Sequence, residues 1–494
     1  MVGFAFVTWM LFLGAIDKTI VNDFCFLNVL IVPVIHTTPS RNLLRRKFLH
    51  HKASQGQKGT LIVSYGDMIC IYWSPLFKRI IAVFFFWCTT CTSHAYSILT
   101  HEALIDVNWE KVLLPLLKQK YPGSTEAELK EAHAYAYGGA VVPDMGYFPR
   151  GSKLFTNLIH YVRSGDFIMA LLQDAQNLNE YAFALGVLCH YNADKYGHSI
   201  GINTGVPITY PKVEQKFGDT ATFEEDPVAH VRMEFSFDVL QTARGNYAPE
   251  TYHDFIGFKI ARPLLEKSFF QIYGINVNDL FNNLGRTIGT FRWVVKDLFP
   301  GITRAAWASK KGEISKATPG ATSRKFIYTM HRKNYNRDFV NKDERPPSFA
   351  NLWSLLIRIA PKIGPLRVLK FKAPGAVAEK LFIQSFDTTV KYYTWHISRL
   401  RSGSIVLDNI NFDTGLETAP EEYKLTDKTY TELVSKLWSR QFDSVSVSLQ
   451  QNILSFFSGY KPVTTTKRTK KEWQRTEQSL AQLKTMQPEV KQGK

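Results

Sequence analysis

The sequence is poor in cysteine, in acidic residues and in patterns that predict β-strands. Its 494 residues include five cysteines. Almost no segment alternates apolar and polar residues over the length of a strand, which argues against a sheet. No internal repeat and no glycine-rich phosphate loop is present. The hydrophobic share of 45% and charged share of 21% are those of a globular protein, and the length allows two or three domains.

Acidic residues are outnumbered by basic ones, 43 to 60, which gives a formal net charge of +17. A basic surface favours anionic partners such as phospholipid headgroups, nucleic acid or phosphorylated substrates. The alternative is a solvated surface with an excess of lysine. Charge alone does not choose among these partners.

A secretory signal peptide is predicted for residues 68–95. The basic pair at 78–79 precedes an apolar run at 80–87, and small residues end the segment at Ser93-His94-Ala95. This pattern predicts cleavage between Ala95 and Tyr96. The mature protein would then be secreted or periplasmic and would keep Cys189 alone, without an intrachain disulfide.

Residues 1–67 form an uncertain upstream segment, because Met68 would start a signal of normal length. The alternative is that Met1–Ile16 is the true signal or anchor. That run is broken by Asp17-Lys18 and is short for a membrane-spanning helix.

The remainder of the chain predicts an all-α fold: a multi-helix bundle with a helical C-terminal extension. Residues 96–300 form the expected catalytic domain, 301–348 a linker, 349–460 a helical C-terminal region and 461–494 a basic tail, either disordered or a solvated helix. Gly138-Gly139 and Pro143 predict a turn that presents Asp144. Helical patterns cover 109–120, 124–137, 154–163, 166–172, 181–196, 227–244, 254–273, 277–281, 287–298, 352–359, 375–398 and 430–457.

Potential metal ligands are concentrated between Tyr96 and Glu234. His190, Asp194 and His198 follow at steps of four residues, which place side chains on one face of a helix. Imidazole and carboxylate are the zinc ligands of hydrolytic sites. The candidate ligands are Tyr96, His101, Asp144, His160, His190, Asp194, His198, His230 and Glu234. The other histidines after residue 95 lie outside this pattern: His133, His253, His331 and His396.

Over roughly residues 96–300 this arrangement resembles the zinc-dependent phospholipase C family. Its superfamily also includes zinc nucleases that degrade single strands and the catalytic domain of glycosylphosphatidylinositol-specific phospholipase D. The family begins its mature chain with a residue whose amino and carbonyl groups bind zinc, and in some members a His follows five residues later. Tyr96 and His101 have this spacing. Many members have Trp in the first place, so Tyr96 is a departure.

Further segments carry the same resemblance. Gly139-Ala-Val-Val-Pro-Asp144 matches the family's Gly-Ala-hydrophobic-hydrophobic-Pro-Asp, and His160 follows sixteen residues later. The step from Asp194 to His198 is four residues, as in the phospholipase D type, whereas classical phospholipases C and the nucleases have six. The pair His230 and Glu234 ends in Glu, whereas the nucleases usually have Asp in that place. Both details favour lipid phosphodiesters over nucleic acid.

The resemblance implies three zinc ions per chain. One would take Asp144, His160, His190 and Asp194, a second His198, His230 and Glu234, and a third Tyr96, His101 and the bridging Asp194. It implies phospholipid hydrolysis by metal-bound hydroxide, with Asp144 as a possible proton acceptor. Tyr147, Phe148 and Tyr161 are candidates for a headgroup pocket or for core packing, and Arg163 for a phosphate contact or a surface salt bridge.

Three function classes follow from these residues. The first is a phospholipid phosphodiesterase of C type, with D-type cleavage of glycosylphosphatidylinositol-like lipids as the alternative. The second is a zinc-dependent single-strand nuclease, which would need an aromatic clamp for bases, and no clear set is present. The third is a protein that uses zinc only for stability. We expect a phospholipid substrate, contact between the basic surface and a membrane, and no stable nucleic-acid partner. The oligomeric state is not indicated.

Overall fold

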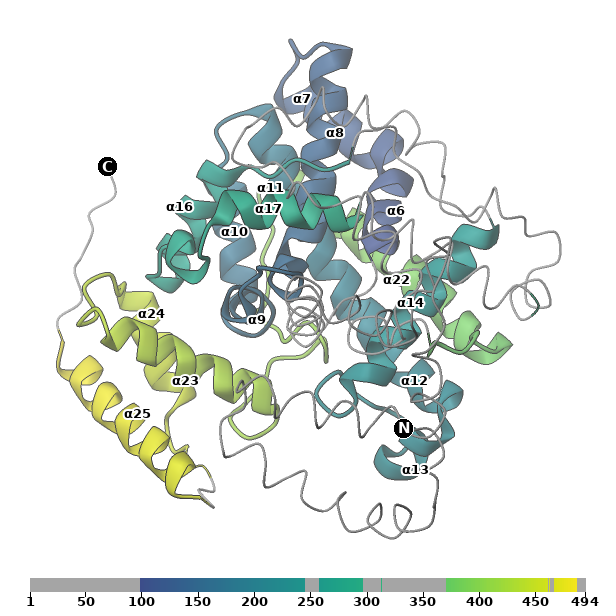
Figure 1. The fold of residues 1–494 in the computed structure, drawn as a ribbon. Coiled ribbons are helices and arrows are strands. Elements are labelled where there is room, and N and C mark those ends of the chain that lie inside the picture. The colour runs from purple at the N-terminus through teal and green to yellow at the C-terminus, as the bar shows by residue number, and fades with distance from the viewer. Residues whose placement is uncertain are drawn as a thin grey trace, which may run out of the picture. The chain divides into compact units, whose positions relative to one another are not determined.

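A computed structural model describes residues 98–244, 257–295, 312, 370–460, 462 and 466–486. These residues contain helices and no strand, so the predicted all-α fold is confirmed for them (Figure 1). The expected signal peptide, Tyr96, nearly all of the expected linker and the helix expected at 352–359 lie outside this part. The helices before the linker are α6 (Ile98–Asn108), α7 (Leu114–Lys120), α8 (Glu126–Val141), α9 (Lys153–Tyr161), α10 (Ser164–Asp174), α11 (Leu178–Tyr196), α12 (Asn203–Thr209), α13 (Pro211–Phe217), α14 (Pro227–Arg244), α16 (Arg262–Tyr273) and α17 (Leu284–Trp293).

Short π and 3₁₀ turns connect or extend several of these helices. The π turns are η3 (Trp109–Leu113) and η5 (Gly197–Ile202), and the 3₁₀ turns are η4 (Val142–Tyr147) and η6 (Val277–Leu280). The C-terminal region adds α22 (Ala376–Arg401), α23 (Lys424–Trp438), α24 (Val447–Phe456) and α25 (Lys467–Thr485). No helix among the described residues combines the length and the hydropathy needed to cross a bilayer.

Helices α8 and α11 cross in close contact at two glycines. A Cβ atom on Gly139 would lie 2.0 Å from the carbonyl oxygen of Phe183, and one on Gly186 would lie 2.0 Å from that of Ala136. The turn predicted at Gly138-Gly139 is therefore wrong: both residues belong to α8, where the lack of a side chain admits neighbouring backbone. The turn that presents Asp144 is η4, which follows α8 directly.

Two other helix predictions need correction. Residues 257–261 are not helical, because Lys259 N–H donates to Ala134 O at 2.9 Å and holds this stretch against α8; α16 starts only at Arg262, with Pro263 in its first turn. The helix expected at 430–457 is two helices. Gln441 and Phe442 have φ of 54° and 60°, which ends the first of them.

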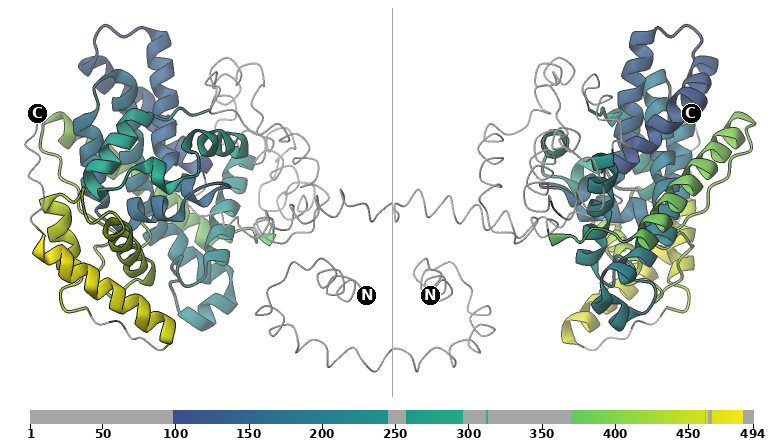
Figure 2. Two further views of the ribbon diagram at one scale, coloured as in Figure 1. Left: turned by 60° about the vertical axis from the view of Figure 1, so that its left-hand side comes forward. Right: turned by 90° about the vertical axis from the view of Figure 1, so that its right-hand side faces the viewer.

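The C-terminal region packs on the helices that precede it. Its longest helix, α22, contacts α11, η5 and α12, and α23 contacts α9. A continuous apolar core includes Leu104 of α6, Tyr393 of α22 and Leu483 of α25. Helix α25 lies on α23 and α24 (Figure 2). The basic tail therefore contains a helix, which agrees with the second of the two expected alternatives, and the disordered alternative is wrong for residues 467–485. The helix is exposed along most of its length but not wholly solvated, because Thr476, Ser479 and Leu483 are buried.

We predict that Gly139→Ala destabilises the protein by about 1–3 kcal/mol, because the new methyl group forces α8 and α11 apart. Thermal or urea unfolding measures the change. Gly123→Ala is the matched control, since a Cβ there meets nothing within 4 Å. Its free energy of unfolding should change by less than about 0.5 kcal/mol. Equal stability of both variants would contradict the described helix contact.

Candidate metal centre

Eight of the nine predicted ligands lie within the described residues, and all eight are buried. Tyr96 lies just before them and is not described. The helices and turns of the first half of the chain contribute these side chains from separate places. His101 comes from α6, Asp144 from η4, His160 from α9, His190 and Asp194 from α11, His198 from η5, and His230 and Glu234 from α14.

Asp194 lies at the middle of this cluster. Its carboxylate oxygens are 3.0 Å from His190 Nε2, 3.4 Å from His160 Nε2 and 3.5 Å from His101 Nε2. His198 Nε2 lies 3.9 Å away on the following turn. The steps of four residues along α11 and η5 thus bring His190, Asp194 and His198 together. His198 lies in η5, which is a π turn, and π turns are frequent at functional sites.

Two further carboxylates face the same imidazoles. Asp144 Oδ1 lies 3.3 Å from His160 Nε2, and Asp144 Oδ2 lies 3.9 Å from His101 Nε2. Glu234 Oε1 lies 3.1 Å from His230 Nε2 and 3.4 Å from His198 Nε2. The donor atoms therefore form two adjoining groups, one around Asp144 and Asp194 and one around Glu234.

The spacing of these donor atoms fits zinc. Two atoms bound to one tetrahedral zinc at its usual bond lengths are about 3.4 Å apart. Most of the distances above lie near that value. In addition, the described part of the chain donates no hydrogen bond of ordinary geometry to the carboxylate oxygens of Asp144, Asp194 or Glu234. Buried carboxylates without such donors need a cation nearby.

Backbone carbonyls set the orientation of two of the imidazoles. His160 Nδ1 lies 2.9 Å from Thr156 O, and His190 Nδ1 lies 2.8 Å from Ala140 O. A carbonyl oxygen accepts a hydrogen bond, so each Nδ1 carries a proton, and Nε2 is the nitrogen that faces the cluster and can bind a metal once it has lost its own proton. This is the usual orientation of a metal-binding histidine.

Burial and neighbouring charges shift the pKa values within the cluster in different directions. Burial raises the pKa of Asp144. Burial acts the same way on Asp194, but the charges of His190 and His198 outweigh it and hold the pKa of Asp194 well below its usual value. Burial and the charge of His190 lower the pKa of His101. For His160, burial lowers the pKa, yet Asp144 and Asp194 raise it to about 9.

Sequence reasoning missed one carboxylate of the cluster. Among the described residues, three groups of side chains are close enough to hold a metal ion: His101, His190 and Asp194; Asp144, His160 and His190; and His198, His230 and Asp413. Asp413 lies in the C-terminal region, with Oδ1 3.4 Å from His198 Nδ1. No spacing rule links it to His198, since the pair is brought together only by the tertiary fold. The one sequence signal is Asn409-Ile-Asn-Phe-Asp413, a polar and apolar alternation after a long helix.

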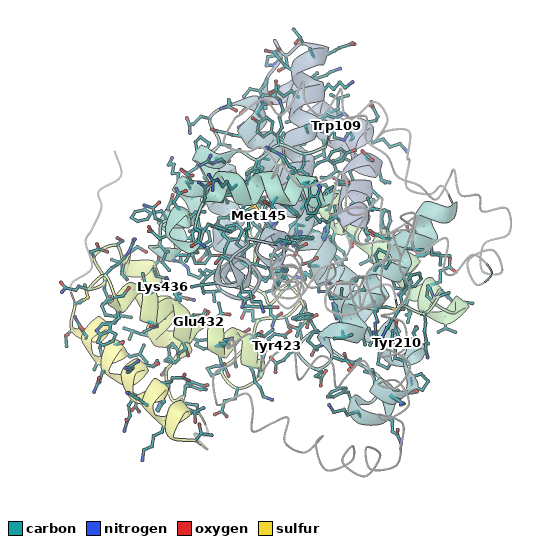
Figure 3. All side chains as sticks on the ribbon, in the orientation of Figure 1. Trp109, Met145, Tyr210, Tyr423, Glu432 and Lys436 are labelled. Atoms are coloured by element: carbon teal, nitrogen blue, oxygen red, sulfur yellow. The ribbon has the colours of Figure 1, made fainter. Side chains whose placement is uncertain are left out.

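The candidates for a headgroup pocket are buried in the packing around the cluster. Tyr147 lies edge-on to His160 with ring centroids 5.9 Å apart, and Phe148 packs on Phe291 at 4.6 Å. Tyr161 packs on Tyr423 at 5.4 Å. Figure 3 shows Tyr423 at the start of α23. Their positions are those of the core-packing alternative.

Arg163 does not sit at the protein surface. Its Nε donates to Asp166 Oδ2 at 2.8 Å and its Nη1 to Ile272 O at 2.9 Å, so the guanidinium holds α10 against α16. Of the two alternatives expected for Arg163, the salt bridge is present, with Asp166 as its partner, but the guanidinium is buried and not at the surface. A phosphate contact does not fit, because its donors are engaged within the fold.

Two of the histidines outside the ligand pattern are described, and each has a packing partner away from the cluster. His133 stacks on Trp109 with centroids 3.8 Å apart, and His396 Nδ1 lies 2.9 Å from Asn192 Oδ1. The division of the histidines made from the sequence therefore agrees with their positions in the fold.

Comparison with protein families gives a match over the part of the chain that carries this cluster. Residues 91–282 match the model described as zinc dependent phospholipase C. Comparison with curated proteins and comparison with solved structures each gave no match. The matched range contains all nine predicted ligands and ends before the C-terminal region that carries Asp413. The resemblance seen in the sequence is confirmed over residues 91–282, which match the model of the zinc-dependent phospholipase C family.

Proposed function

We propose that this protein is a phospholipase C that hydrolyses the phosphodiester bond of phospholipids at a centre of three zinc ions. The observation that carries the proposal is the buried cluster of five imidazoles and three carboxylates within the matched domain. Family membership supports a zinc-dependent hydrolase of phospholipids. The number of ions, the C-type cleavage and the role of each residue are the proposed parts.

The donor atoms suit three ions. Asp144, His160, His190 and Asp194 would hold one, and His198, His230 and Glu234 a second. His101 and Asp194 would hold a third together with the backbone of Tyr96. Asp194 is shared, which agrees with its contacts to four imidazoles.

Bound zinc supplies Lewis acidity and lowers the pKa of water to about 7. The two central carboxylates are suited to different tasks, because their pKa values are shifted in opposite directions. Asp194 stays ionised and holds the imidazoles in place. Asp144, whose pKa is raised by burial, is the better proton acceptor and would take the proton of the attacking water.

The choice between cleavage types rests on products. We expect the purified protein to convert phosphatidylcholine into diacylglycerol and phosphocholine. Release of phosphatidic acid, or cleavage of a glycosylphosphatidylinositol anchor alone, would favour the D type. Hydrolysis of single-stranded DNA without action on lipid would contradict the proposal. Lipid and water-soluble products can be identified by mass spectrometry.

We further propose that the chain acts outside the cytoplasm and that its mature form starts at Tyr96. The support is the signal pattern together with the position of His101 on α6, five residues after Tyr96. Sequencing the N-terminus of exported active protein should read Tyr-Ser-Ile-Leu. An active enzyme that starts elsewhere would remove Tyr96 as an amino-group ligand.

Contact with a membrane through the basic surface belongs to the same proposal. Helix α25 exposes Lys470, Lys471, Arg475 and Lys484, while its buried residues face α23 and α24. Anionic lipids attract such a face.

We predict that Asp194→Asn reduces phosphodiesterase activity at least about a hundredfold, because the amide removes the charge shared by two zinc ions. Glu234→Gln should reduce the activity less, because Glu234 would bind only one zinc ion. Asp219→Asn is the matched control, since Asp219 is exposed and lies outside the cluster. Initial rates on phosphatidylcholine give the comparison. Full activity and full metal content in Asp194→Asn would contradict the bridging role.

We predict that zinc binding releases a proton near neutral pH. In the metal-free protein the pKa of His160 is about 9, so its imidazole is protonated at pH 7, whereas zinc needs the neutral form. Affinity should therefore rise with pH, by about tenfold per unit between pH 6 and 8 for one proton. Calorimetry in two buffers of different ionisation enthalpy measures the release. A zinc affinity that stays constant between pH 6 and 8 would contradict the role of His160 as a zinc ligand that must lose a proton.

A further inference from the structure

A segment of the C-terminal region enters the metal centre from outside the matched domain. Residues 407–413 follow α22 and lie more than a hundred residues beyond the end of the family match. Phe412 and Asp413 are both buried. The sequence between α22 and α23 thus contributes side chains to a centre whose other members lie before residue 235.

Hydrogen bonds hold this segment in place from two sides. Phe412 N–H donates to His160 O at 3.0 Å, and Asn203 Nδ2 donates to Asp413 O at 2.7 Å. The ring of Phe412 lies 5.0 Å from that of His160 and 5.8 Å from that of His190. The backbone around Asp413 is therefore anchored to the same elements that carry the predicted ligands.

The two oxygens of Asp413 have different surroundings. Oδ2 accepts hydrogen bonds from Phe223 N–H at 2.9 Å and from Tyr423 O–H at 2.7 Å. Oδ1 faces His198 Nδ1 at 3.4 Å and His230 Nε2 at 4.0 Å. The donors on Oδ2 fix the rotation of the carboxylate and aim its other oxygen at His198.

The opposite nitrogen of His198 faces the remaining ligands. Nε2 lies 3.4 Å from Glu234 Oε1 and 3.9 Å from Asp194 Oδ1. A zinc ion held by His198, His230 and Glu234 therefore belongs on the Nε2 side. Asp413 then stands behind the imidazole, where Thr156 O stands for His160 and Ala140 O for His190.

We propose that Asp413 is a positioning residue for the zinc ligand His198, and that the C-terminal region is thereby part of the metal centre. In the zinc-bound state His198 Nδ1–H would donate to Asp413 Oδ1, which lies 3.4 Å away, and this would keep the lone pair on Nε2 and fix the ring orientation. A carboxylate behind a zinc-bound histidine also increases the basicity of the ligand. This inference rests on the zinc centre of the proposed function.

The amide variant gives a sharp test because Oδ2 has two fixed donors. In Asp413→Asn the amide oxygen must take the place of Oδ2, since an NH₂ group there would face Phe223 N–H and Tyr423 O–H. The NH₂ group is then aimed at His198 Nδ1, which has to accept. The imidazole proton moves to Nε2 and blocks the metal, although the shape of the side chain is nearly unchanged.

Full-length protein is tested with cobalt, which replaces zinc and reports its coordination in the visible spectrum. We expect Asp413→Asn to bind one equivalent of cobalt about 10–100-fold more weakly than the wild type and with a changed spectrum. Asp408→Asn is the matched control, since Asp408 is exposed in the same segment, and should equal the wild type. Equal affinity and equal spectra for Asp413→Asn and the wild type would overturn the proposal.

A measurement on the unchanged chain covers the case in which Asp413→Asn does not fold. With ¹⁵N-labelled histidine and bound ¹¹³Cd, nuclear magnetic resonance identifies the nitrogen of His198 that carries the metal. Coupling at Nε2 with a protonated Nδ1 supports the proposal, and coupling at Nδ1 overturns it. If the wild type binds no metal, both the proposed function and this inference are contradicted. If the wild type binds metal and Asp413→Asn binds it equally well, the inference alone is contradicted.

Discussion

The structure depends on the compensation of buried charge around Asp194. An ionised carboxylate in a dry interior is strongly unfavourable unless opposite charge or hydrogen-bond donors surround it. Four imidazoles approach Asp194 within 4 Å, from α6, α9, α11 and η5. Because these elements are far apart in the sequence, the cluster constrains how the helices pack, and a bound cation would stabilise the fold and the site together.

Close packing of α8 and α11 makes that arrangement possible. Gly139 and Gly186 let the two helices approach closely, because the backbone of the partner helix occupies the space that a side chain at either glycine would need. Asp144 follows α8 directly, and His190 lies one turn beyond Gly186 on α11. The separation of the two helices therefore sets the distance between these ligands, which explains why small residues are found at this crossing.

Local patterns in the sequence identified the parts of the centre that lie on single helices. His190, Asp194 and His198, like His230 and Glu234, are placed by helical periodicity, and a run of four-residue steps reveals them. Periodicity did not reveal that Gly138-Gly139 continue α8, because a glycine pair is equally typical of a turn. Asp413 was missed for another reason: its distance to His198 is set by the packing of α22 and the following segment, which no local rule describes.

The C-terminal region changes how the domain is understood. The family match ends at residue 282, yet the described core is continuous through α22 and α23, and Tyr161 of α9 packs on Tyr423 at the start of α23. Asp413 and Phe412 extend this contact to the imidazoles themselves. The matched domain is therefore completed by sequence that lies outside it.

The measurement that tests the central claim most directly is anomalous diffraction at the zinc absorption edge from crystals of the mature protein. The account predicts three peaks inside the cluster: one among Asp144, His160 and His190, one beside His101 and Asp194, and one on the Nε2 side of His198. The absence of a peak inside the cluster, in crystals grown with zinc, would contradict it.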